Sequence, residues 1–320
     1  MTPPVVVVAE GMFESSVIDA ENERGLARLV RGRFDGPAAI QDATADADAV
    51  MISVHALPAS SIAALSPSVR IIGRAGIGLD AIDLEAARAR GVAVFHTPDY
   101  CTMEVADHAA ALILALARRL FPADATARRD WPAWRSIGEI RALADSTLGV
   151  VGCGRIGREV IRRMAPFGLR IVAFDPWVSE APPPAQMVGS LDELLAAADI
   201  VTLHSPLTDE TRGMLGAEQF GRMQAGAYLV NVSRGGLVNE PDLADALVSG
   251  HLGGAAIDVL STEPPPGDSP IFSAPNTIIT PHTAWYSVAS EQRVFAETIE
   301  GLTAYLRGVE PASGRLAVRP

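Results

Sequence analysis

Three residues with complementary chemistry follow successive apolar segments in the last third of the chain: Arg234, Glu263 and His282. A guanidinium can hold a carboxylate through two parallel hydrogen bonds while it polarises a neighbouring carbonyl. An imidazole can give or take a proton near neutral pH, and a carboxylate beside it stabilises its protonated form and fixes its orientation. Together, these groups are sufficient for the interconversion of a 2-keto acid and a 2-hydroxy acid by hydride transfer.

Each of the three residues also has a plainer interpretation when it is taken alone. An arginine after a strand is more often a surface ion-pair partner, and a lone glutamate is usually solvated. Any of the six histidines could be an ordinary core or surface residue. Their shared position, each after a strand-like segment, favours the chemical interpretation.

A glycine-rich run upstream indicates where the hydride donor binds: Gly152-Cys153-Gly154-Arg155-Ile156-Gly157. It follows an apolar segment directly and opens a helical one. The first glycine permits a tight turn, the second lets the backbone approach a pyrophosphate, and the third lets helix and strand pack closely. The start of the helix then offers free N–H groups to the phosphates. Chance glycine clusters occur in a chain with 28 glycines, so a purely structural turn is the alternative.

The choice of cofactor depends on Asp175, which ends the next strand-like segment. A carboxylate at this position accepts hydrogen bonds from the ribose 2′-hydroxyl and repels a 2′-phosphate. Pro176 and Trp177 follow it, where an arginine could have bound that phosphate. The sequence therefore predicts NAD rather than NADP.

Short β-branched segments alternate with helical ones along most of the chain, which is typical of parallel α/β sheets with crossover helices. In the first hundred residues we expect strands at Val5–Ala9, Ala49–Val54, Arg70–Gly73 and Val92–Phe95, with a helix at Asp83–Arg90. From residue 147 we expect six strands, at Thr147–Gly152, Arg170–Asp175, Ile200–His204, Ala227–Asn231, Gly254–Asp258 and Asn276–Thr280. Helices are expected between them and at 105–120 and 290–306. The segment 121–144, which carries two tryptophans, fits neither sheet and is interpreted as a protruding arm.

Composition and charge limit the classes of function. A chain of 320 residues is long enough for about two domains, and 48% hydrophobic with 20% charged residues is typical of globular proteins. The net charge of −12 argues against a nucleic-acid partner. Two cysteines cannot build a disulfide framework or a four-ligand zinc site, so we expect no metal. No segment is typical of a signal peptide or a membrane span, which predicts a cytoplasmic protein without a membrane partner.

Taken together, these motifs resemble those of the D-isomer-specific 2-hydroxyacid dehydrogenase family. The resemblance covers essentially the whole chain and rests on Gly152–Gly157 with Asp175, on residues 229–238 (LVNVSRGGLV), on Asp258 with Glu263-Pro264, and on Pro281-His282. It implies two Rossmann-like domains with doubly wound parallel sheets. Residues 1–99 and 288–320 would form a discontinuous, flavodoxin-like substrate-binding domain, and residues 100–287 an NAD-binding domain. It also implies that Arg234, Glu263 and His282 are catalytic and that the protein is a homodimer.

The same resemblance implies further contacts to both ligands. For the cofactor these are Arg155 and Ile156 at the pyrophosphate, Pro206, Val232 and Asp258 on the path to the nicotinamide, and Ser233 as a further contact. For the acid they are the backbone N–H groups of Gly76 and Ile77, with Arg74 and Trp285 shaping the pocket. An ordinary turn at residues 73–78 and ordinary packing of Trp285 are the alternatives.

The branch of the family is indicated by residues 282–287, which read HTAWYS. This run is similar to the C-terminal binding protein branch, which carries Trp three residues after the histidine, and D-lactate dehydrogenases have a related run. Phosphoglycerate dehydrogenases usually show Leu-Gly-Ala-Ser there, and many have an additional C-terminal domain that this chain is not expected to have. The chain is thus similar to the C-terminal binding protein-like and phosphoglycerate dehydrogenase-like branches.

Two other functions are the alternatives to a D-specific 2-keto acid reductase. One is a corepressor-like binding scaffold that responds to NAD(H) with little turnover, and the complete set of Arg234, Glu263 and His282 argues against it. The other is oxidation of formate or phosphite. Formate dehydrogenases pair their histidine with glutamine, so Glu263 argues against that activity.

Overall fold

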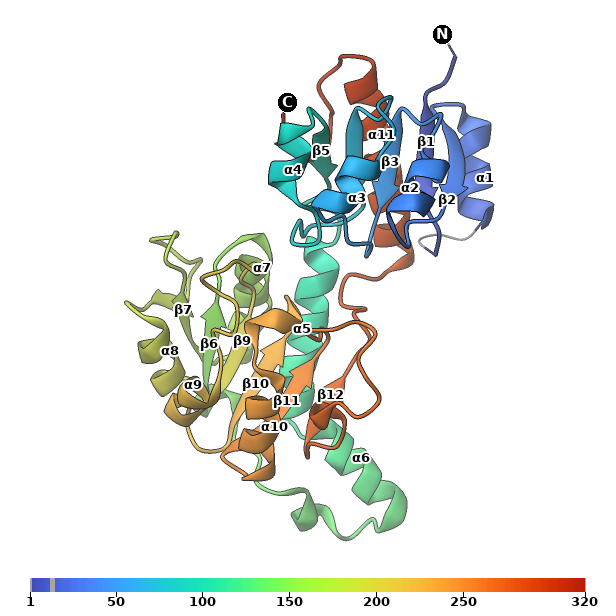
Figure 1. Ribbon diagram of the computed structural model, residues 1–320. Helices are drawn as coiled ribbons and strands as arrows, with labels where there is room; N and C mark the ends of the chain where they lie inside the picture. Colours follow the sequence, from blue (N-terminus) through green and yellow to red (C-terminus); the bar gives the residue numbers. More distant parts are fainter. Residues whose placement is uncertain (1, 12–14, 320) are drawn as a thin grey trace. The chain divides into compact units, whose positions relative to one another are not determined.

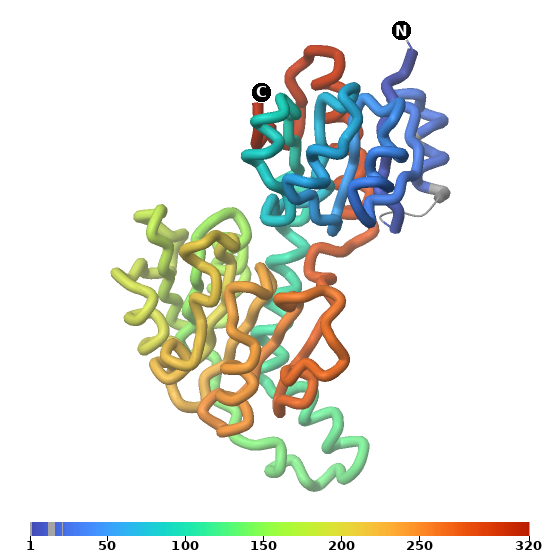
Figure 2. Tube along the Cα trace, in the orientation of Figure 1, coloured from blue at the N-terminus to red at the C-terminus, as the bar shows by residue number. Residues whose placement is uncertain are grey.

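The computed structural model describes residues 2–11 and 15–319, which form two compact units (Figure 1). One unit comprises residues 1–101 and 287–320, and the other comprises residues 102–286. The chain thus leaves the first unit once and returns to it, so that the C-terminal segment lies in the same unit as the N-terminal strands (Figure 2). The α/β class that the sequence predicts is confirmed.

The first unit is built on a six-stranded sheet with the order β13-β5-β4-β3-β1-β2. Its strands are β1 (Val5–Ala9), β2 (Arg28–Gly32), β3 (Ala49–Ile52), β4 (Ile71–Arg74), β5 (Ala93–His96) and β13 (Arg315–Val318). Among these described strands all neighbours are parallel except β13, which runs antiparallel to β5. The sequence did not indicate β2 and β13, because edge strands that carry arginines lack the continuous apolar run of a strand buried on both faces.

Helices cover both faces of this sheet: α1 (Ser15–Arg24), α2 (Pro37–Ala43), α3 (Ala59–Ala64), α4 (Leu84–Ala89) and α11 (Val288–Leu306). Ile72 of β4 packs in the core that includes residues of α2 to α4. Its neighbour Gly73 faces the other way, where a Cβ would lie 2.9 Å from side-chain atoms of Thr298 and Leu302. This alternation along β4 places α11 on the opposite face from α2 to α4.

The second unit contains a seven-stranded parallel sheet with the order β12-β11-β10-β9-β6-β7-β8. Its strands are β6 (Thr147–Val151), β7 (Arg170–Phe174), β8 (Gln186–Met187), β9 (Ile200–Leu203), β10 (Ala227–Asn231), β11 (Leu252–Ile257) and β12 (Thr277–Ile279). Six of the seven were expected, and the two-residue β8 is too short to leave a pattern in the sequence. The order reverses between β6 and β9, which makes their carboxyl ends the usual ligand site of such a sheet.

The helices of the second unit are α5 (Thr102–Ala117), α6 (Leu120–Arg129), α7 (Arg155–Met164), α8 (Leu191–Ala197), α9 (Ala217–Arg222) and α10 (Glu240–Val248). The α5 helix packs against α7 and against β9 to β11, whereas α8 packs against β6 and β7. Residues 121–144, all of which the structure describes, contribute no strand to either sheet and leave Trp131 81% exposed. None of the helices in residues 2–11 and 15–319 combines the length and the apolar character that a membrane span requires.

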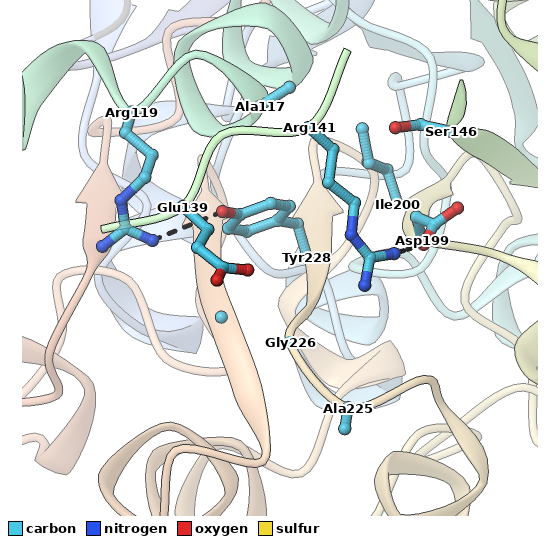
Figure 3. Close-up of a pocket in the computed structure, with 11 residues that line it drawn as sticks. Ala117, Arg119, Glu139, Arg141, Ser146, Asp199, Ile200, Ala225, Gly226 and Tyr228 are labelled. Atoms are coloured by element: carbon cyan, nitrogen blue, oxygen red, sulfur yellow. Dashed lines mark hydrogen bonds and ion pairs between the residues drawn. The ribbon is translucent and has the colours of Figure 1, made fainter. Parts of the chain in front are cut away.

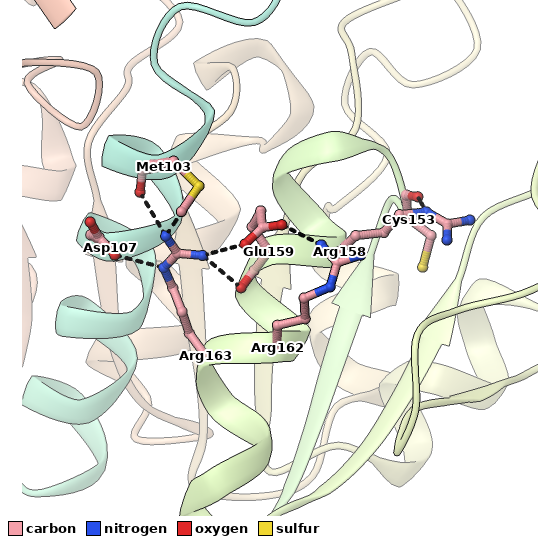
Figure 4. A network of polar contacts seen from close by, with 7 residues as sticks. All are labelled: Met103, Asp107, Cys153, Arg158, Glu159, Arg162 and Arg163. Carbon is pink, nitrogen blue, oxygen red and sulfur yellow. Dashed lines mark hydrogen bonds and ion pairs between the residues drawn. The ribbon is translucent and has the colours of Figure 1, made fainter.

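The helix α7, which begins at the glycine-rich run, contacts α5 through Arg163 (Figure 4). Arg163 Nε donates to Asp107 Oδ1 on α5 at 2.6 Å, and Nη1 donates to Glu159 Oε2 on α7 at 2.7 Å. The Arg163 and Glu159 side chains are only 18% and 21% exposed. The pair with Glu159 is largely shielded from water, so removing Arg163 would leave a poorly solvated carboxylate, whereas Asp107 is 69% exposed.

We expect Arg163→Met to lower the free energy of unfolding by about 1–2 kcal/mol, because Glu159 would keep a half-buried charge with a weaker partner. Urea denaturation followed by circular dichroism measures this loss. The matched control is Arg128→Met, which removes an exposed i,i+4 pair with Asp124 on α6 and should have no measurable effect. Equal losses in the two variants would contradict the anchoring role of Arg163.

Candidate active site

The chemistry-bearing residues of the second unit lie at one edge of its sheet. All of its strands are parallel, so their carboxyl ends meet at the same edge. Gly152 follows β6, Asp175 follows β7, Arg234 follows β10 and His282 follows β12. The structure therefore brings the predicted cofactor loop and the predicted catalytic residues to a common edge.

His282 and Glu263 are in direct contact. Nδ1 of His282 lies 2.6 Å from Oε2 of Glu263, and Oε1 of Glu263 accepts a hydrogen bond from the Leu260 N–H at 2.9 Å. The His282 side chain is 39% exposed, and within the described residues its Nε2 makes no hydrogen bond. The geometry assigns the Nδ1 proton to the contact with Glu263, which leaves Nε2 as the nitrogen that can exchange a proton with a substrate.

The Glu263 carboxyl is held in its ionised form. Burial by itself would raise its pKa, but hydrogen bonds from His282 and the Leu260 N–H, with the charges of His282 and Arg234, outweigh burial and lower the pKa below its usual value. The carboxylate is therefore charged at neutral pH and can stabilise an imidazolium. Because the charge of Arg234 acts on the same carboxylate, the three predicted catalytic side chains share one electrostatic environment.

The chain around Arg234 is folded tightly after β10. Asn231 Oδ1 accepts from the Ser233 N–H at 3.1 Å, and its Nδ2 donates to the Arg234 carbonyl at 2.9 Å. At Gly235 a Cβ would lie 1.9 Å from the Leu260 carbonyl carbon, so only glycine allows this approach. The close packing places Arg234 beside the loop that leads from Leu260 to Glu263.

Asp258 is buried and only 2% exposed. Its Oδ1 accepts from the Thr280 hydroxyl at 2.5 Å and the Thr283 N–H at 2.9 Å, and its Oδ2 accepts from the Ala284 N–H at 3.0 Å. The Asp258 carbonyl accepts from the His282 N–H at 2.8 Å. This carboxylate holds the turn that carries His282, which has a left-handed backbone with φ +54°. The place beside the nicotinamide that the resemblance implies for Asp258 stays a prediction.

His108 on α5 extends the same network and was missed by sequence reasoning. Its Nε2 lies 3.1 Å from the hydroxyl of Thr280 and 3.7 Å from Oδ1 of Asp258. His108 and Thr280 are 172 residues apart, so no local pattern could have connected them. The helix α5 thereby supports the turn of the candidate catalytic histidine.

The three glycines of the cofactor loop meet different surroundings. Gly152 has φ +95°, and a Cβ there would lie 2.7 Å from the carbonyl of His204. At Gly157 a Cβ would lie 2.0 Å from the carbonyl oxygen of Gly152. At Gly154 a Cβ would meet no described residue within 4 Å apart from its own neighbours in the chain. The protein itself therefore requires the first and third glycines, while the second borders open space, as the glycine of a pyrophosphate-binding loop must.

The start of α7 and Asp175 also suit a dinucleotide. No side chain in the described part of the chain caps the first turn of α7, which leaves N–H groups to bind phosphate. Asp175 Oδ2 accepts from the Cys153 N–H at 2.8 Å, and Oδ1 accepts from the Trp177 N–H at 2.9 Å. Each oxygen keeps a second lone pair that can accept a ribose hydroxyl. The carboxylate thus tethers the glycine loop in addition to its predicted task.

The thiol of Cys153 lies within the cofactor loop. Burial, with the nearby charge of Asp175, raises the pKa of Cys153 to about 11. The thiol therefore stays protonated at neutral pH and is unreactive. No group of three or more His, Cys, Asp or Glu side chains in residues 2–11 and 15–319 is arranged to hold a metal ion.

The remaining predicted cofactor residues differ in exposure. Arg155 is exposed at the first position of α7, and Ile156 is half-buried behind it. Pro206 is exposed after β9, whereas Val232 is buried. Ser233 Oγ donates to the Ser205 carbonyl at 2.5 Å, which joins the loops after β9 and β10.

The predicted substrate loop lies at the carboxyl end of β4 in the first unit. Arg74 Nε donates to the Gly78 carbonyl at 3.0 Å and Nη1 to the Ala75 carbonyl at 2.6 Å, so the guanidinium stabilises its own loop. At Gly76, with φ +147°, a Cβ would lie 2.5 Å from Arg74 Nη1. The N–H of Gly76 donates to Thr97 Oγ1 at 3.0 Å. In this conformation the Gly76 N–H is thus donated within the protein, and its contact with a substrate stays a prediction.

Two other residues that were predicted to contact the substrate are Ile77 and Trp285. The N–H of Ile77 makes no hydrogen bond within the described residues, while its carbonyl lies 3.0 Å from His96 Nδ1. Trp285, in the second unit, is half-buried and packs edge-to-face on Tyr286 with ring centroids 5.6 Å apart. Of the two N–H groups named for the acid, that of Ile77 is the one without a partner.

The similarity of the chain to known proteins supports the same family. Residues 110–284 match the model of the D-isomer specific 2-hydroxyacid dehydrogenase NAD binding domain. The chain is 38% identical over 316 residues to a D-3-phosphoglycerate dehydrogenase of Mycobacterium tuberculosis, covering 96% of this chain and 58% of that protein. It is 34% identical over 279 residues to a glycerate dehydrogenase of Methylorubrum extorquens, covering 85% of this chain and 87% of that protein. The chain thus spans just over half the length of the phosphoglycerate dehydrogenases it matches.

Solved structures agree with this assignment. A Thermus thermophilus protein with 37% identity aligns with a TM-score of 0.85 over 97% of this chain and 99% of the other. A D-lactate dehydrogenase of Aquifex aeolicus, solved with NAD and lactic acid, has 28% identity and a TM-score of 0.83 over 95% of this chain and 96% of the other. The resemblance inferred from the motifs is confirmed, and the chain belongs to the D-isomer specific 2-hydroxyacid dehydrogenase family.

Proposed function

We propose that the protein is an NAD-dependent oxidoreductase that transfers a hydride between nicotinamide and a small 2-hydroxy or 2-keto acid with D specificity. The observation that carries the proposal is the 2.6 Å contact between His282 and Glu263 at the edge of the sheet that bears the glycine loop. Relatives named as dehydrogenases of phosphoglycerate, glycerate and D-lactate support this class of substrate.

Each catalytic side chain has one task in this proposal. Arg234 binds the substrate carboxylate and polarises the adjacent carbonyl. In reduction, Nε2 of protonated His282 donates its proton to the carbonyl oxygen, and in oxidation neutral Nε2 takes the hydroxyl proton. Glu263 stabilises the imidazolium and holds the ring by its Nδ1. NAD(H), when bound, supplies or accepts the hydride.

We assign cofactor binding to the second unit, which also carries the proposed catalytic residues, and we keep the first unit as the substrate-binding domain that the resemblance implied. The pyrophosphate would lie at Gly152–Gly157, with the ribose at Asp175 and the nicotinamide on the path formed by Pro206, Val232 and Ser233. In the first unit the Ile77 N–H, within the loop that Arg74 stabilises, would contribute to carboxylate binding. Trp285 would shape the substrate pocket, which sets the size of the acid.

We further propose that the protein is a homodimer formed through the second unit. Phe121, Trp131 and Trp134 are 60%, 81% and 59% exposed, and aromatic side chains are enriched at protein–protein interfaces. Two free cysteines, both buried, are compatible with the reducing cytoplasm that we expected from the sequence.

We expect His282→Ala to lower kcat for reduction of 2-keto acids by about 10²–10⁴-fold, because proton donation is lost. The dissociation constant of NADH should not change, since the imidazole does not bind the cofactor. NADH absorbance, recorded with glyoxylate, pyruvate, hydroxypyruvate and 2-ketoisocaproate, measures the rates. A large loss of NADH affinity would contradict the role of His282. If the unaltered protein binds NADH and reduces no acid, a binding scaffold is favoured instead.

The pH dependence of that rate tests Glu263. Because its pKa is lowered, the carboxylate and its contact with His282 persist at every pH above the ordinary carboxyl pKa of about 4.3 and are lost only as pH falls through the lower value. Reduction should therefore not decline between about pH 7 and pH 5. In Glu263→Gln the ring of His282 loses its charged partner, so reduction should be slower than in the unaltered protein. The control is Glu218→Gln, which changes an exposed carboxylate on α9 and should leave the rate of reduction unchanged.

We expect Asp175→Asn to reduce the preference for NADH over NADPH by at least about tenfold, because the charge that repels a 2′-phosphate is gone. An amide oxygen can still accept from the Cys153 N–H, so the glycine loop should keep its shape. The ratio of kcat/KM values for the two cofactors is the measurement. Unchanged selectivity in a folded variant would exclude Asp175 as the ribose ligand.

Gly154→Ala should leave the thermal unfolding midpoint unchanged and weaken NADH binding by at least about tenfold, since the added methyl enters the space assigned to the pyrophosphate. Gly157→Ala should lower the midpoint, because its Cβ would lie 2.0 Å from the Gly152 carbonyl oxygen. Differential scanning fluorimetry and NADH titration separate the two effects. NADH binding that survives Gly154→Ala unchanged would contradict the cofactor assignment.

A further inference from the structure

The second unit contains a cavity of about 230 Å³ at the opposite edge of the sheet, where the strands begin (Figure 3). Its wall includes Ile200 at the start of β9 and Tyr228 near the start of β10. The glycine loop and Arg234 follow the carboxyl ends of the same sheet. A five-residue strand is about 15 Å long, so the cavity is separate from the candidate active site.

Two of the four charged side chains in this cavity neutralise each other. Arg141 Nη1 lies 2.6 Å from Asp199 Oδ1. The other oxygen of Asp199 accepts from the Thr147 N–H at 2.8 Å, at the first residue of β6. This pair is satisfied by the protein and forms one wall of the cavity.

The guanidinium of Arg119 has weaker hydrogen bonds than that of Arg141. Its Nη1 lies 3.4 Å from the Tyr228 hydroxyl and its Nη2 lies 3.5 Å from Asn276 Oδ1, both at the limit of a hydrogen bond. Its Nε is buried and has no hydrogen-bond partner among the described residues. Arg119 also has a left-handed backbone with φ +49°, which is unusual for a residue other than glycine. A half-buried guanidinium with weak partners is suited to bind a carboxylate through its two-pronged edge.

Glu139 brings the opposite charge to the same cavity. The preceding residue, Gly138, has φ +86° and a Cβ there would lie 3.3 Å from Cζ of Arg119, so the backbone packs directly against the guanidinium. Glu139 lines the cavity but forms no hydrogen bond or ion pair within the described residues. Arg119 and Glu139 thus face one cavity without pairing with each other.

We propose that this cavity binds a small zwitterion that carries one carboxylate and one ammonium group, as an α-amino acid does. Arg119 receives the carboxylate, with the Tyr228 hydroxyl as a further donor, and Glu139 receives the ammonium group. The four charged side chains sum to zero, which disfavours a dianion. The volume lies below the range of about 300–1,000 Å³ that drug-sized ligands and cofactors occupy, so the site selects a small molecule.

Calorimetric titration of the full chain tests the proposal, with glycine and L-alanine as zwitterions and acetate and methylamine as singly charged probes. We expect both zwitterions to bind at least about tenfold more tightly than either singly charged probe. Acetate that binds as tightly as glycine would overturn the proposal in favour of a simple anion site. Absence of heat with glycine at its highest soluble concentration would also overturn it.

Three variants locate the binding. Glu139→Gln alters an exposed side chain and should keep the fold, and it should weaken glycine binding at least about tenfold while acetate binding is unchanged. Arg119→Lys should weaken the binding of both glycine and acetate. Arg234→Met removes the carboxylate ligand proposed for the active site and should leave glycine binding unchanged. Loss of glycine binding in Arg234→Met, with no loss in Glu139→Gln, would place the amino acid in the active site and overturn the proposal.

Discussion

The buried carboxylate of Asp258 is the interaction on which the candidate active site depends. An ionised group with 2% exposure is costly unless donors surround it, and here a hydroxyl and two backbone N–H groups do so. The main chain of Asp258 adds a fourth bond by accepting from the His282 N–H. The end of β11 and the turn after β12 are therefore held together. His282 is fixed in a left-handed conformation from which its ring reaches Glu263.

The same support extends to the cofactor loop through α5. His108 on α5 contacts Thr280 of the Asp258 network, and Asp107, the preceding residue, binds Arg163 of α7. The helix α7 begins directly at the glycine loop. The groups proposed to handle the proton and the loop proposed to hold the dinucleotide thus rest on one helix. A fixed position of the proton-transfer groups relative to the cofactor loop is needed because hydride and proton must reach neighbouring atoms.

The sequence predicted those parts of the structure that depend on local pattern. Strands buried on both faces leave continuous apolar runs, so six strands of the second unit and the residues after them could be identified, and with them Arg234 and His282. Edge strands such as Arg28–Gly32 have few buried residues and leave a weaker pattern. Hydrogen bonds between distant segments leave none: the donation from the Gly76 N–H to Thr97 and the contact of His108 with Thr280 could be found only in three dimensions.

The charged side chains at the two edges of the second sheet are arranged differently, and the strand β10 connects the two edges. At the carboxyl edge, the charges of Arg234 and His282 act on Glu263, whose carboxylate is kept ionised. At the amino edge, Arg119 and Glu139 share a cavity without pairing. Tyr228 and Asn231 lie on β10, which is hydrogen-bonded on both sides to β9 and β11 and is buried along most of its length. A strand held in this way resists deformation. Ligands at the two edges should therefore bind independently, which is why substitutions at Glu139 and Arg234 can separate them.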